Sequence, residues 1–95
     1  MYNPKQIPQY KFNEDLILSR LEQYVNATYS QHYATTGKQT TEMVFEHGHG
    51  DGFCIGNIMK YAQRFGKKEG RNEKDLYKVI HYAIILLGSM QNEEA

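Results

Sequence analysis

The stretch from Gly52 to Gly88 restricts the fold more than any other part of the chain, because it holds two helix-length segments joined by one short turn. Apolar residues recur at helical spacing in about residues 52–66 and again in about residues 73–88. The connection between them is the short string GKKEGRN. Short connections join antiparallel neighbours, so the sequence predicts an antiparallel helical hairpin.

The ends of both segments carry helix-boundary signals. Gly66 suits the C-cap, and Lys67 and Lys68 lie where cations favour the negative end of the helix dipole. Asn72 is a good N-cap for the second segment, which we expect to end at Gly88. The hairpin therefore has defined ends in the sequence.

A further helix is predicted near the N-terminus. Residues 1–12 should form an extended arm, because Pro4 and Pro8 oppose helix. Asn13 is a good N-cap for the helix that follows. Helical spacing places five residues on one side of it: Ile17, Leu21, Tyr24, Val25 and Thr28.

The middle of the chain is less decisive. After the polar connection SQHYATTGKQ, the string TTEMVFEH suits a short helix capped by Thr40 or Thr41, or alternatively a strand. The glycines of GHGDG then break the chain, so the hairpin should begin near Gly52 or Phe53. All long elements are helical. We therefore expect one all-α domain over residues 1–95, with residues 89–95 as a frayed tail.

The first hairpin helix concentrates positive charge in a chain whose net charge is zero. At about 100° per residue, one face carries a donor stripe of Asn57, Lys60, Tyr61, Arg64 and Lys68. The apolar residues fall largely on the other side and are expected to face the core: Ile55, Ile58, Met59, Ala62 and Phe65.

The second hairpin helix divides in the same way. Its expected core stripe is Leu76, Ile80, Ala83 and Leu87, and Asp75, Lys78 and Tyr82 share a different face. In an antiparallel hairpin Asp75, at the start of its helix, should lie close to Arg64 or Lys68 at the end of the preceding helix. A carboxylate there is expected to orient Arg64 through a bidentate pair.

The donor stripe has the chemistry that recognises a phosphate with a sugar or base. Arginine and lysine neutralise charge, asparagine both donates and accepts, and tyrosine can stack. The GHGDG glycines precede a helix N-terminus, where free N–H groups favour anions. The spacing around Gly66 does not match a Walker A loop. The alternatives are a solvated helix face, glycines that only make turns, and tyrosines that only pack.

Composition excludes several classes of protein. Lysine plus arginine and aspartate plus glutamate number eleven each, whereas binding to long nucleic acid normally needs a basic excess. The single cysteine, Cys54, cannot form an intramolecular disulfide, which favours a cytosolic location. No apolar run approaches membrane-spanning length, and the N-terminus lacks a signal-peptide core.

The remaining histidine, cysteine and acidic side chains do not define a further site in the sequence. His47 and His49 with Glu42 and Glu46 offer metal-ligand chemistry, but they straddle flexible glycines, so we assign no metal. Cys54 is expected to be a small core residue. His81 is expected at an interhelical or surface position, and no Ser-His-Asp arrangement is evident.

Three strings resemble a family of small phage proteins of mostly unknown function: His32-Tyr33, the run GFCIGNIMKYAQRFGKK, and KDLYKVIHY. The shared pattern covers about His32 to Leu87. Its positions in this chain are Phe53, Gly56, Asn57, Lys60, Tyr61, Arg64, Gly66, Lys67 and Lys68, followed by Asp75, Leu76, Lys78 and Tyr82.

The best-known member of that family is the T7-type phage nucleotide kinase, which phosphorylates deoxynucleoside monophosphates without a P-loop. The resemblance therefore implies a nucleotide-handling phage protein in the cytoplasm of an infected bacterium. This chain is shorter than that kinase, has its own N-terminal helix and carries the GHGDG insert outside the pattern. Shared helices can therefore support binding without kinase activity.

We expect a nucleotide, or a nucleotide-like phosphate ligand, to bind across the hairpin, with ATP or another nucleotide as substrate if there is catalysis and no other cofactor assigned. Arg64 and Asp75 are the expected catalytic residues. The expected ligand-binding residues are Asn57, Lys60, Tyr61, Lys67, Lys68, Lys78, Tyr82, His32 and Tyr33. The alternatives are a protein that sequesters a nucleotide and an inhibitor of a host enzyme.

The C-terminal string YAIILLGSM predicts self-association. It carries apolar residues on nearly every face of its helix, and one helix in a chain of 95 residues cannot bury them all internally. We therefore expect a homo-oligomer, at least a dimer. A host protein remains an alternative partner, and neither a membrane nor long nucleic acid is expected.

Overall fold

The computed structural model describes residues 7–33 and 39–94, and the side chains of His32, Tyr33 and Glu94 lie outside that description. The described residues form four α-helices, one π-helical turn and no strand. The all-α class predicted from the sequence is confirmed. The elements in chain order are α1 (Glu14–Thr28), η1 (Tyr29–Tyr33), α2 (Thr40–Glu46), α3 (Gly50–Arg64) and α4 (Glu73–Glu94).

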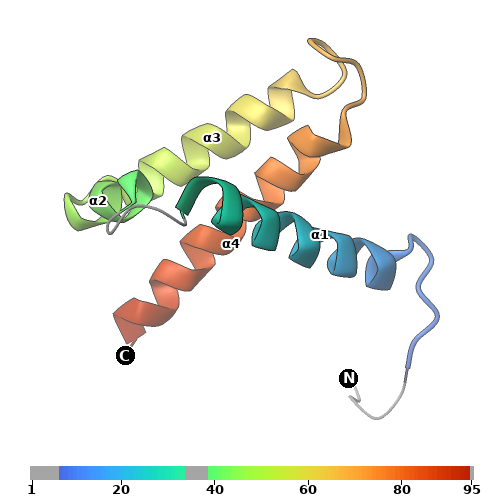
Figure 1. The fold of residues 1–95 in the computed structure, drawn as a ribbon, viewed down its shortest axis with the longest axis horizontal. Coiled ribbons are helices and arrows are strands. Elements are labelled where there is room, and N and C mark those ends of the chain that lie inside the picture. Colours follow the sequence, from blue (N-terminus) through green and yellow to red (C-terminus); the bar gives the residue numbers. More distant parts are fainter. Residues whose placement is uncertain (1–6, 34–38, 95) are drawn as a thin grey trace.

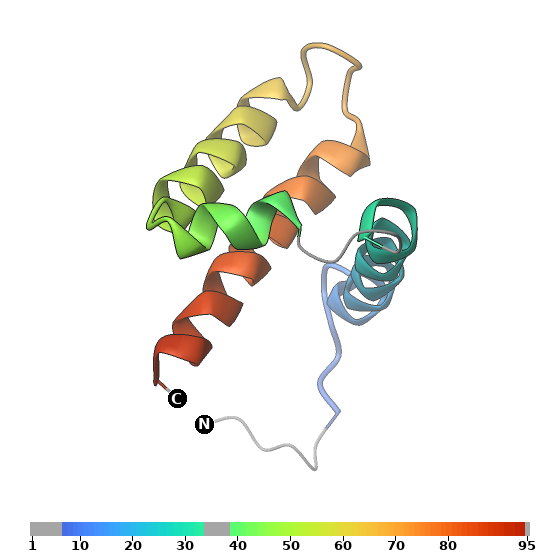
Figure 2. The same ribbon diagram turned by 60° about the vertical axis from the view of Figure 1, so that its left-hand side comes forward.

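Helices α3 and α4 form the predicted antiparallel hairpin, which is the largest contact between elements (Figure 1). Helix α1 lies against α4, and α2 leads directly into α3 (Figure 2). The radius of gyration is 15.6 Å, whereas a compact domain of about 100 residues has about 13 Å. The chain is thus more open than a well-filled small domain.

Helix α1 begins where the sequence predicts, but by a different device. Asn13 adopts a left-handed backbone with φ 57° and makes no side-chain cap bond. Asn13 does occupy the predicted N-cap position, but side-chain capping normally needs the extended region at that residue, so the side-chain bond is not formed. The Phe12 N–H instead donates to Oε1 of Glu14 at 2.8 Å. The five predicted inward residues of α1 are its least exposed ones, including buried Leu21.

The ambiguous string before the glycines is helix α2, so the strand alternative is excluded. Gln39, rather than Thr40 or Thr41, occupies the N-cap. The backbone N–H of Gln39 donates to Oε1 of Glu42 at 3.4 Å, which is part of a capping box.

Helix α3 begins at Gly50, two residues earlier than predicted. Gly48 makes the turn with φ 83°, which an L side chain rarely adopts. Gly50 is buried, and a Cβ there would overlap the ring of Phe45. Gly48 is therefore needed for its backbone conformation, and Gly50 is needed for close packing against Phe45. At the far end, Gly66 has φ 84° as expected of a C-cap glycine.

Helix α4 is longer than predicted. Oδ1 of Asn72 accepts from the Lys74 N–H at 2.9 Å, which confirms its capping role. The helix then continues through Gly88 to Glu94, so the predicted end at Gly88 and the frayed tail from residue 89 are wrong. Glycine ends a helix when it turns left-handed, and Gly88 has no positive φ. An internal glycine costs only about 1 kcal/mol.

The hydrophobic core is thin. Leu21 and Cys54 are the only buried hydrophobic residues among those described. The apolar stripe of α3 that we expected in the core is instead mostly turned to solvent, with Met59 65% exposed. On α4, Leu87 of the expected core stripe is 57% exposed, and Leu76 is exposed too. The expectation was therefore wrong for Ile55, Met59 and Ala62 of α3 and for Leu76 and Leu87 of α4, whereas Ile58, Phe65, Ile80 and Ala83 are half-buried.

Aromatic residues explain this reversal. Phe53 and Tyr61 of α3 contact Tyr82 of α4, so the helices meet through large rings. Aromatic side chains bury about 150–250 Å² each, more than the isoleucine, methionine and alanine of the opposite stripe offer. The half-polar face of the hairpin is therefore its inner face. The side turned away from it we call the outer apolar face: Ile55, Met59, Ala62, Leu76, Ile80, Ala83, Leu87 and Met90.

Candidate ligand site on the helical hairpin

Tyr61 is the centre of a cluster of cations on the inner face of the hairpin. The Nζ atom of Lys60 lies 5.0 Å from the centroid of its ring, and the guanidinium carbon of Arg64 lies 5.4 Å away. Lys78 comes from α4 and places its Nζ 5.2 Å from the same centroid. Cations within about 6 Å of a ring are attracted by its quadrupole. Both helices thus bring positive charge to one tyrosine.

A second tyrosine completes the cluster. Tyr82 of α4 stacks on Tyr61, with centroids 6.2 Å apart and rings 10° from parallel. Phe53 meets Tyr82 edge-on at 5.7 Å. The three rings hold the backbones of α3 and α4 at a fixed spacing. We call Lys60, Tyr61, Arg64, Lys78 and Tyr82 the tyrosine cluster.

The cations of the cluster are not neutralised within the described part of the chain. None of Lys60, Arg64 and Lys78 forms an ion pair with a described carboxylate. Three positive charges near one ring also repel one another. The arrangement therefore has a net positive potential that an anion would relieve.

Asp75 lies on the same face of α4 as Lys78 and Tyr82, because these residues are three and seven positions further along the helix. Its side chain is only 4% exposed. Its Oδ2 atom is buried and has no hydrogen-bond partner among the described residues. The predicted bidentate pair with Arg64 needs both carboxylate oxygens, so it is not formed, because the Arg64 guanidinium lies over Tyr61 instead.

The remaining predicted ligand residues are spread around this cluster. Asn57 is half-buried, and its Nδ2 donates to the carbonyl of Phe53 at 2.9 Å. Lys67 and Lys68 are exposed in the turn after α3. His32 and Tyr33 belong to η1, but their side chains lie outside the described residues.

The GHGDG segment lies at the other end of α3. Gly50 opens a helix of fifteen residues that ends at Arg64, about 20 Å away at 1.5 Å per residue. Its first turn carries an acid, Asp51. The anion-binding helix N-terminus predicted from these glycines therefore lies far from Arg64, at the opposite end of α3.

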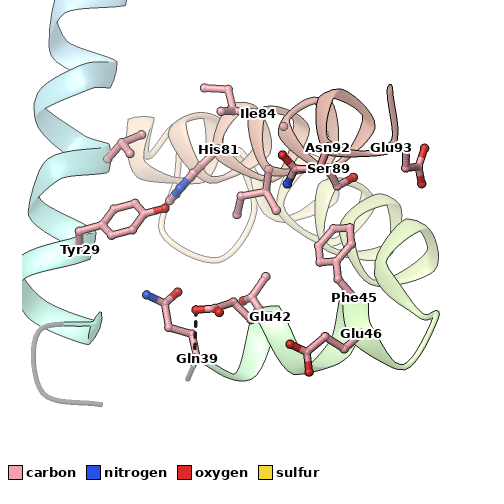
Figure 3. Close-up of a pocket in the computed structure, with 14 residues that line it drawn as sticks. Tyr29, Gln39, Glu42, Phe45, Glu46, His81, Ile84, Ser89, Asn92 and Glu93 are labelled. Atoms are coloured by element: carbon pink, nitrogen blue, oxygen red, sulfur yellow. Dashed lines mark hydrogen bonds between the residues drawn. The ribbon is translucent and has the colours of Figure 1, made fainter. Parts of the chain in front are cut away.

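A groove on a different side of the molecule was missed by the sequence analysis. It has a volume of about 870 Å³ and lies between the end of α1, α2 and the second half of α4 (Figure 3). Among the residues that the structure describes, its lining includes Glu42, Glu46 and Glu93 and no lysine or arginine. The groove is therefore unsuited to a phosphate. It joins three elements that are distant in sequence, so no local pattern marks it.

His81 lines that groove and is one of the few buried polar residues. Burial lowers its pKa, and the nearby charge of Lys78 lowers this pKa further. Tyr24 packs edge-on to it at 6.0 Å and stacks on Tyr77 at 5.6 Å. Tyr29 points toward it across the groove (Figure 3). This aromatic contact attaches α1 to α4, as the predicted interhelical position of His81 allows.

Cys54 is fully buried, and burial together with nearby Asp51 raises the pKa of its thiol. A raised pKa leaves little thiolate, so this cysteine is a packing residue as predicted. Among the described residues, no group of three or more His, Cys, Asp and Glu side chains is placed to hold a metal. None of the described helices combines the length and the apolar character needed to cross a membrane.

Comparison with family models matched residues 27–84 to a family described as a protein of unknown function, DUF3310. The match covers more than half of the 95 residues. The chain belongs to the DUF3310 family. Comparison with curated proteins gave no match, and comparison with solved structures gave none.

The DUF3310 region contains the whole tyrosine cluster and Asp75. It omits all of α1 except its last two residues, and it omits the last ten residues of α4. It also spans nearly the same residues as the pattern seen in the sequence, about His32 to Leu87. The family description assigns no activity, so function has to be argued from the site.

Proposed function

We propose that this DUF3310 protein binds a phosphate-bearing ligand of the nucleotide type at the tyrosine cluster. The observation that carries the proposal is the set of three cations around Tyr61 with no ion pair to a described acid. Protein surfaces usually intersperse opposite charges. A phosphate group can accept charge-assisted hydrogen bonds from several such donors at once.

The aromatic part of the cluster favours a ligand with an organic portion. Phe53, Tyr61 and Tyr82 form a continuous set of rings beside the cations. Such rings supply apolar surface for a sugar or a base, which inorganic phosphate would leave unused. The resemblance to the phage family of the T7-type kinase supports the same ligand class.

Phosphoryl transfer between nucleotides is the second candidate, and one observation favours it. Asp75 carries a carboxylate oxygen that has no partner among the described residues, one helical turn from Lys78. Phosphoryl transfer requires neutralised phosphate charge and an acceptor that positions the attacking hydroxyl. Mixing the protein with ATP and each deoxynucleoside monophosphate, and following diphosphate formation, tests this candidate. Tight binding with no product from any pair supports a sequestering protein in the infected cell instead.

The outer apolar face supports the proposal that the protein works as a homo-oligomer. Its α4 residues recur at alternating intervals of four and three, from Leu76 to Met90, which is the spacing of a helix–helix contact. No Asp, Glu, Lys or Arg occurs between Lys78 and Glu93. Because the core of one chain is thin, a partner that buries this face would add apolar burial, and a second copy of the chain offers a matching apolar surface.

The test of the ligand site compares two arginines of the same hairpin. Arg64→Ala should weaken binding of a nucleotide by about 1.5–3 kcal/mol, the range for hydrogen bonds to charged groups, as measured by calorimetry. Arg71→Ala is the matched control, because Arg71 also lies over a ring, that of Phe65 at 5.3 Å, but outside the cluster. Equal affinity of wild type and Arg64→Ala would return the cluster to a purely structural role.

A further inference from the structure

We propose that Asp75 recognises a hydrogen-bond donor on the ligand, a sugar hydroxyl or a base amino group, next to the phosphate that the cations hold. This inference rests on the proposed function, because it names the second half of the same ligand. It excludes simple phosphates as the natural ligand. It selects nucleotides and sugar phosphates, which carry an anion and a donor a few ångströms apart.

The first observation is the state of Asp75 itself. The residue is 4% exposed, and its buried Oδ2 has no partner among the described residues. Burying a polar atom without a hydrogen bond is costly, and burying a charge without one is more so. Buried side-chain oxygens are nearly always satisfied in native proteins. A buried acceptor without a hydrogen bond in the free protein therefore indicates that a bound ligand supplies the donor.

The second observation is that the acid and the cations stay separate although they are neighbours. Lys78 is three residues after Asp75, the spacing at which opposite charges on a helix meet. Its Nζ nevertheless lies over the ring of Tyr61. Arg64 likewise lies over that ring and makes no bidentate pair with Asp75. Among the described residues, one carboxylate oxygen and three cations on the inner face of the hairpin thus form no pair with one another, as a ligand with both kinds of group requires.

The structural alternative is that Asp75 only helps α4 to begin. An acid in the first turn does favour the helix dipole. That task does not require burial, and Glu73 in the same turn performs it from an exposed position. The N-cap bond is supplied by Asn72. Helix initiation therefore leaves the burial of Asp75 unexplained.

The experiment measures binding of two probes to the full chain by calorimetry. Pyrophosphate supplies charge alone, and a panel of the four deoxynucleoside monophosphates supplies charge with sugar and base donors. Asp75→Asn keeps the shape of the side chain but replaces one acceptor oxygen with a donor. Glu73→Gln is the matched control, since it makes the same change of charge in the same helical turn at an exposed residue.

We expect Asp75→Asn to weaken binding of the best nucleotide by at least about 10-fold, as for the loss of one hydrogen bond to a charged group. Its affinity for pyrophosphate should be unchanged or somewhat higher, because a negative charge has been removed. Glu73→Gln should alter neither affinity by more than about twofold. The thermal midpoint of unliganded Asp75→Asn should not fall, because no protein hydrogen bond to Oδ2 is lost.

The ligand side of the contact identifies the donor without changing the protein. A 2′,3′-dideoxynucleoside monophosphate lacks the sugar hydroxyl. If that hydroxyl meets Asp75, its removal weakens binding to the wild type and has no effect on Asp75→Asn, as a double-mutant cycle requires. Deoxyribose 5-phosphate lacks the base. If only this probe loses affinity for the wild type relative to Asp75→Asn, the donor belongs to the base.

The outcomes separate this inference from the proposed function. If the wild type binds neither pyrophosphate nor any nucleotide, the proposed function itself fails. If it binds a nucleotide and Asp75→Asn binds it within twofold of the wild type, the site stands and the role of Asp75 is overturned. Equal losses for both probes in Asp75→Asn, with a lowered thermal midpoint, would also overturn the role and assign Asp75 to structure.

Discussion

The two faces of the α3–α4 hairpin differ in a way that ordinary packing rules would reverse. The inner face carries the aromatic rings, three cations and buried Asp75. The outer apolar face carries residues such as Met59 and Leu87, which stay largely in solvent. A small domain normally buries its aliphatic stripe and exposes its charges. Here the aromatic rings of the half-polar face hold the two helices together.

Each face of the hairpin carries groups that the described part of the chain does not satisfy. Its inner face has polar groups without a partner in the described part of the chain, and an ordered ligand can satisfy them. Its outer face has apolar area, which only another apolar surface can remove from water. A single chain therefore carries a candidate ligand site, which needs polar partners, and a candidate contact surface, which needs an apolar partner. Mutations on one face should leave the property of the other face intact.

The largest expected effect comes from charge on the outer apolar face. Leu76→Glu combined with Leu87→Glu should dissociate the proposed homo-oligomer, raising its dissociation constant more than about 100-fold, because burying each leucine contributes about 1.5–3 kcal/mol. Light scattering at micromolar concentration measures the change. Leu18→Glu is the control, since Leu18 is a similarly exposed leucine on α1.

A wild-type protein that is a clean monomer in that measurement would contradict the contact surface altogether. Dissociation by Leu18→Glu as well would move the surface from the hairpin to α1. Nucleotide affinity should be retained in the double variant, because neither leucine belongs to the tyrosine cluster.

A smaller effect is expected from the central ring of the inner face. Tyr61→Leu should lower the free energy of unfolding by about 1–3 kcal/mol, because it removes the stacking on Tyr82 and the attraction of three cations. Tyr61→Phe keeps the ring and should cost less than about 0.5 kcal/mol. Urea unfolding measures both. If both variants lose the same stability, the hydroxyl rather than the ring holds the hairpin.

The attachment of α1 should depend on pH through His81. Its pKa is lowered in the folded protein by burial first and by Lys78 second, whereas an unfolded histidine titrates near about 6.5. Below that pH the unfolded chain takes up a proton that the folded chain resists. The free energy of unfolding should therefore fall as pH drops through about 6.5, by at most about 1.4 kcal/mol per pH unit.

Urea unfolding between about pH 7.5 and pH 5.5 gives this slope, and His81→Gln should flatten it whatever its own stability. His47→Gln is the control, because His47 is exposed at the end of α2. An unchanged slope in His81→Gln would assign the pH dependence to other groups. A bound phosphate near Lys78 should lessen the slope, since it offsets one of the two causes of the lowered pKa.

The positions of the helices could be largely predicted from the sequence, because capping and turn signals are local. Asn72 and Gly66 mark the two inner ends of the hairpin in the structure, as predicted. Gly88 was misleading, because a glycine ends a helix only when its backbone turns left-handed, and the sequence does not show whether it does.

The orientation of the hairpin could not be predicted. Helical spacing correctly grouped Lys60, Tyr61 and Arg64, but periodicity says only which residues share a face, not which face turns inward. Both faces of α3 carry large side chains, so the choice depends on contacts with α4. The open oxygen of Asp75 depends on the same three-dimensional arrangement. The groove beside His81 joins elements that no local pattern connects.

The smallest expected effect concerns Gly56, on the Lys60 side of α3. A Cβ at this position would meet nothing within 4 Å in the free chain, and its φ is not positive. Nothing in the described structure therefore requires glycine there. Gly56→Ala should raise the free energy of unfolding by about 0.5–1 kcal/mol through the better helix propensity of alanine.

A bound ligand would explain a glycine at this position. Gly56 lies one helical turn before Lys60, and without a Cβ it lets a ligand approach the backbone of α3 closely. Gly56→Ala should therefore be more stable yet bind a nucleotide several-fold more weakly. Gly88→Ala is the matched control: it also has open space inside a helix but lies away from the tyrosine cluster, so it should gain similar stability with no change in affinity. Thermal unfolding and calorimetry on the two variants measure both quantities. Full affinity in Gly56→Ala would mean that the ligand does not extend along α3 beyond Lys60, and would confine the site to the cations around Tyr61.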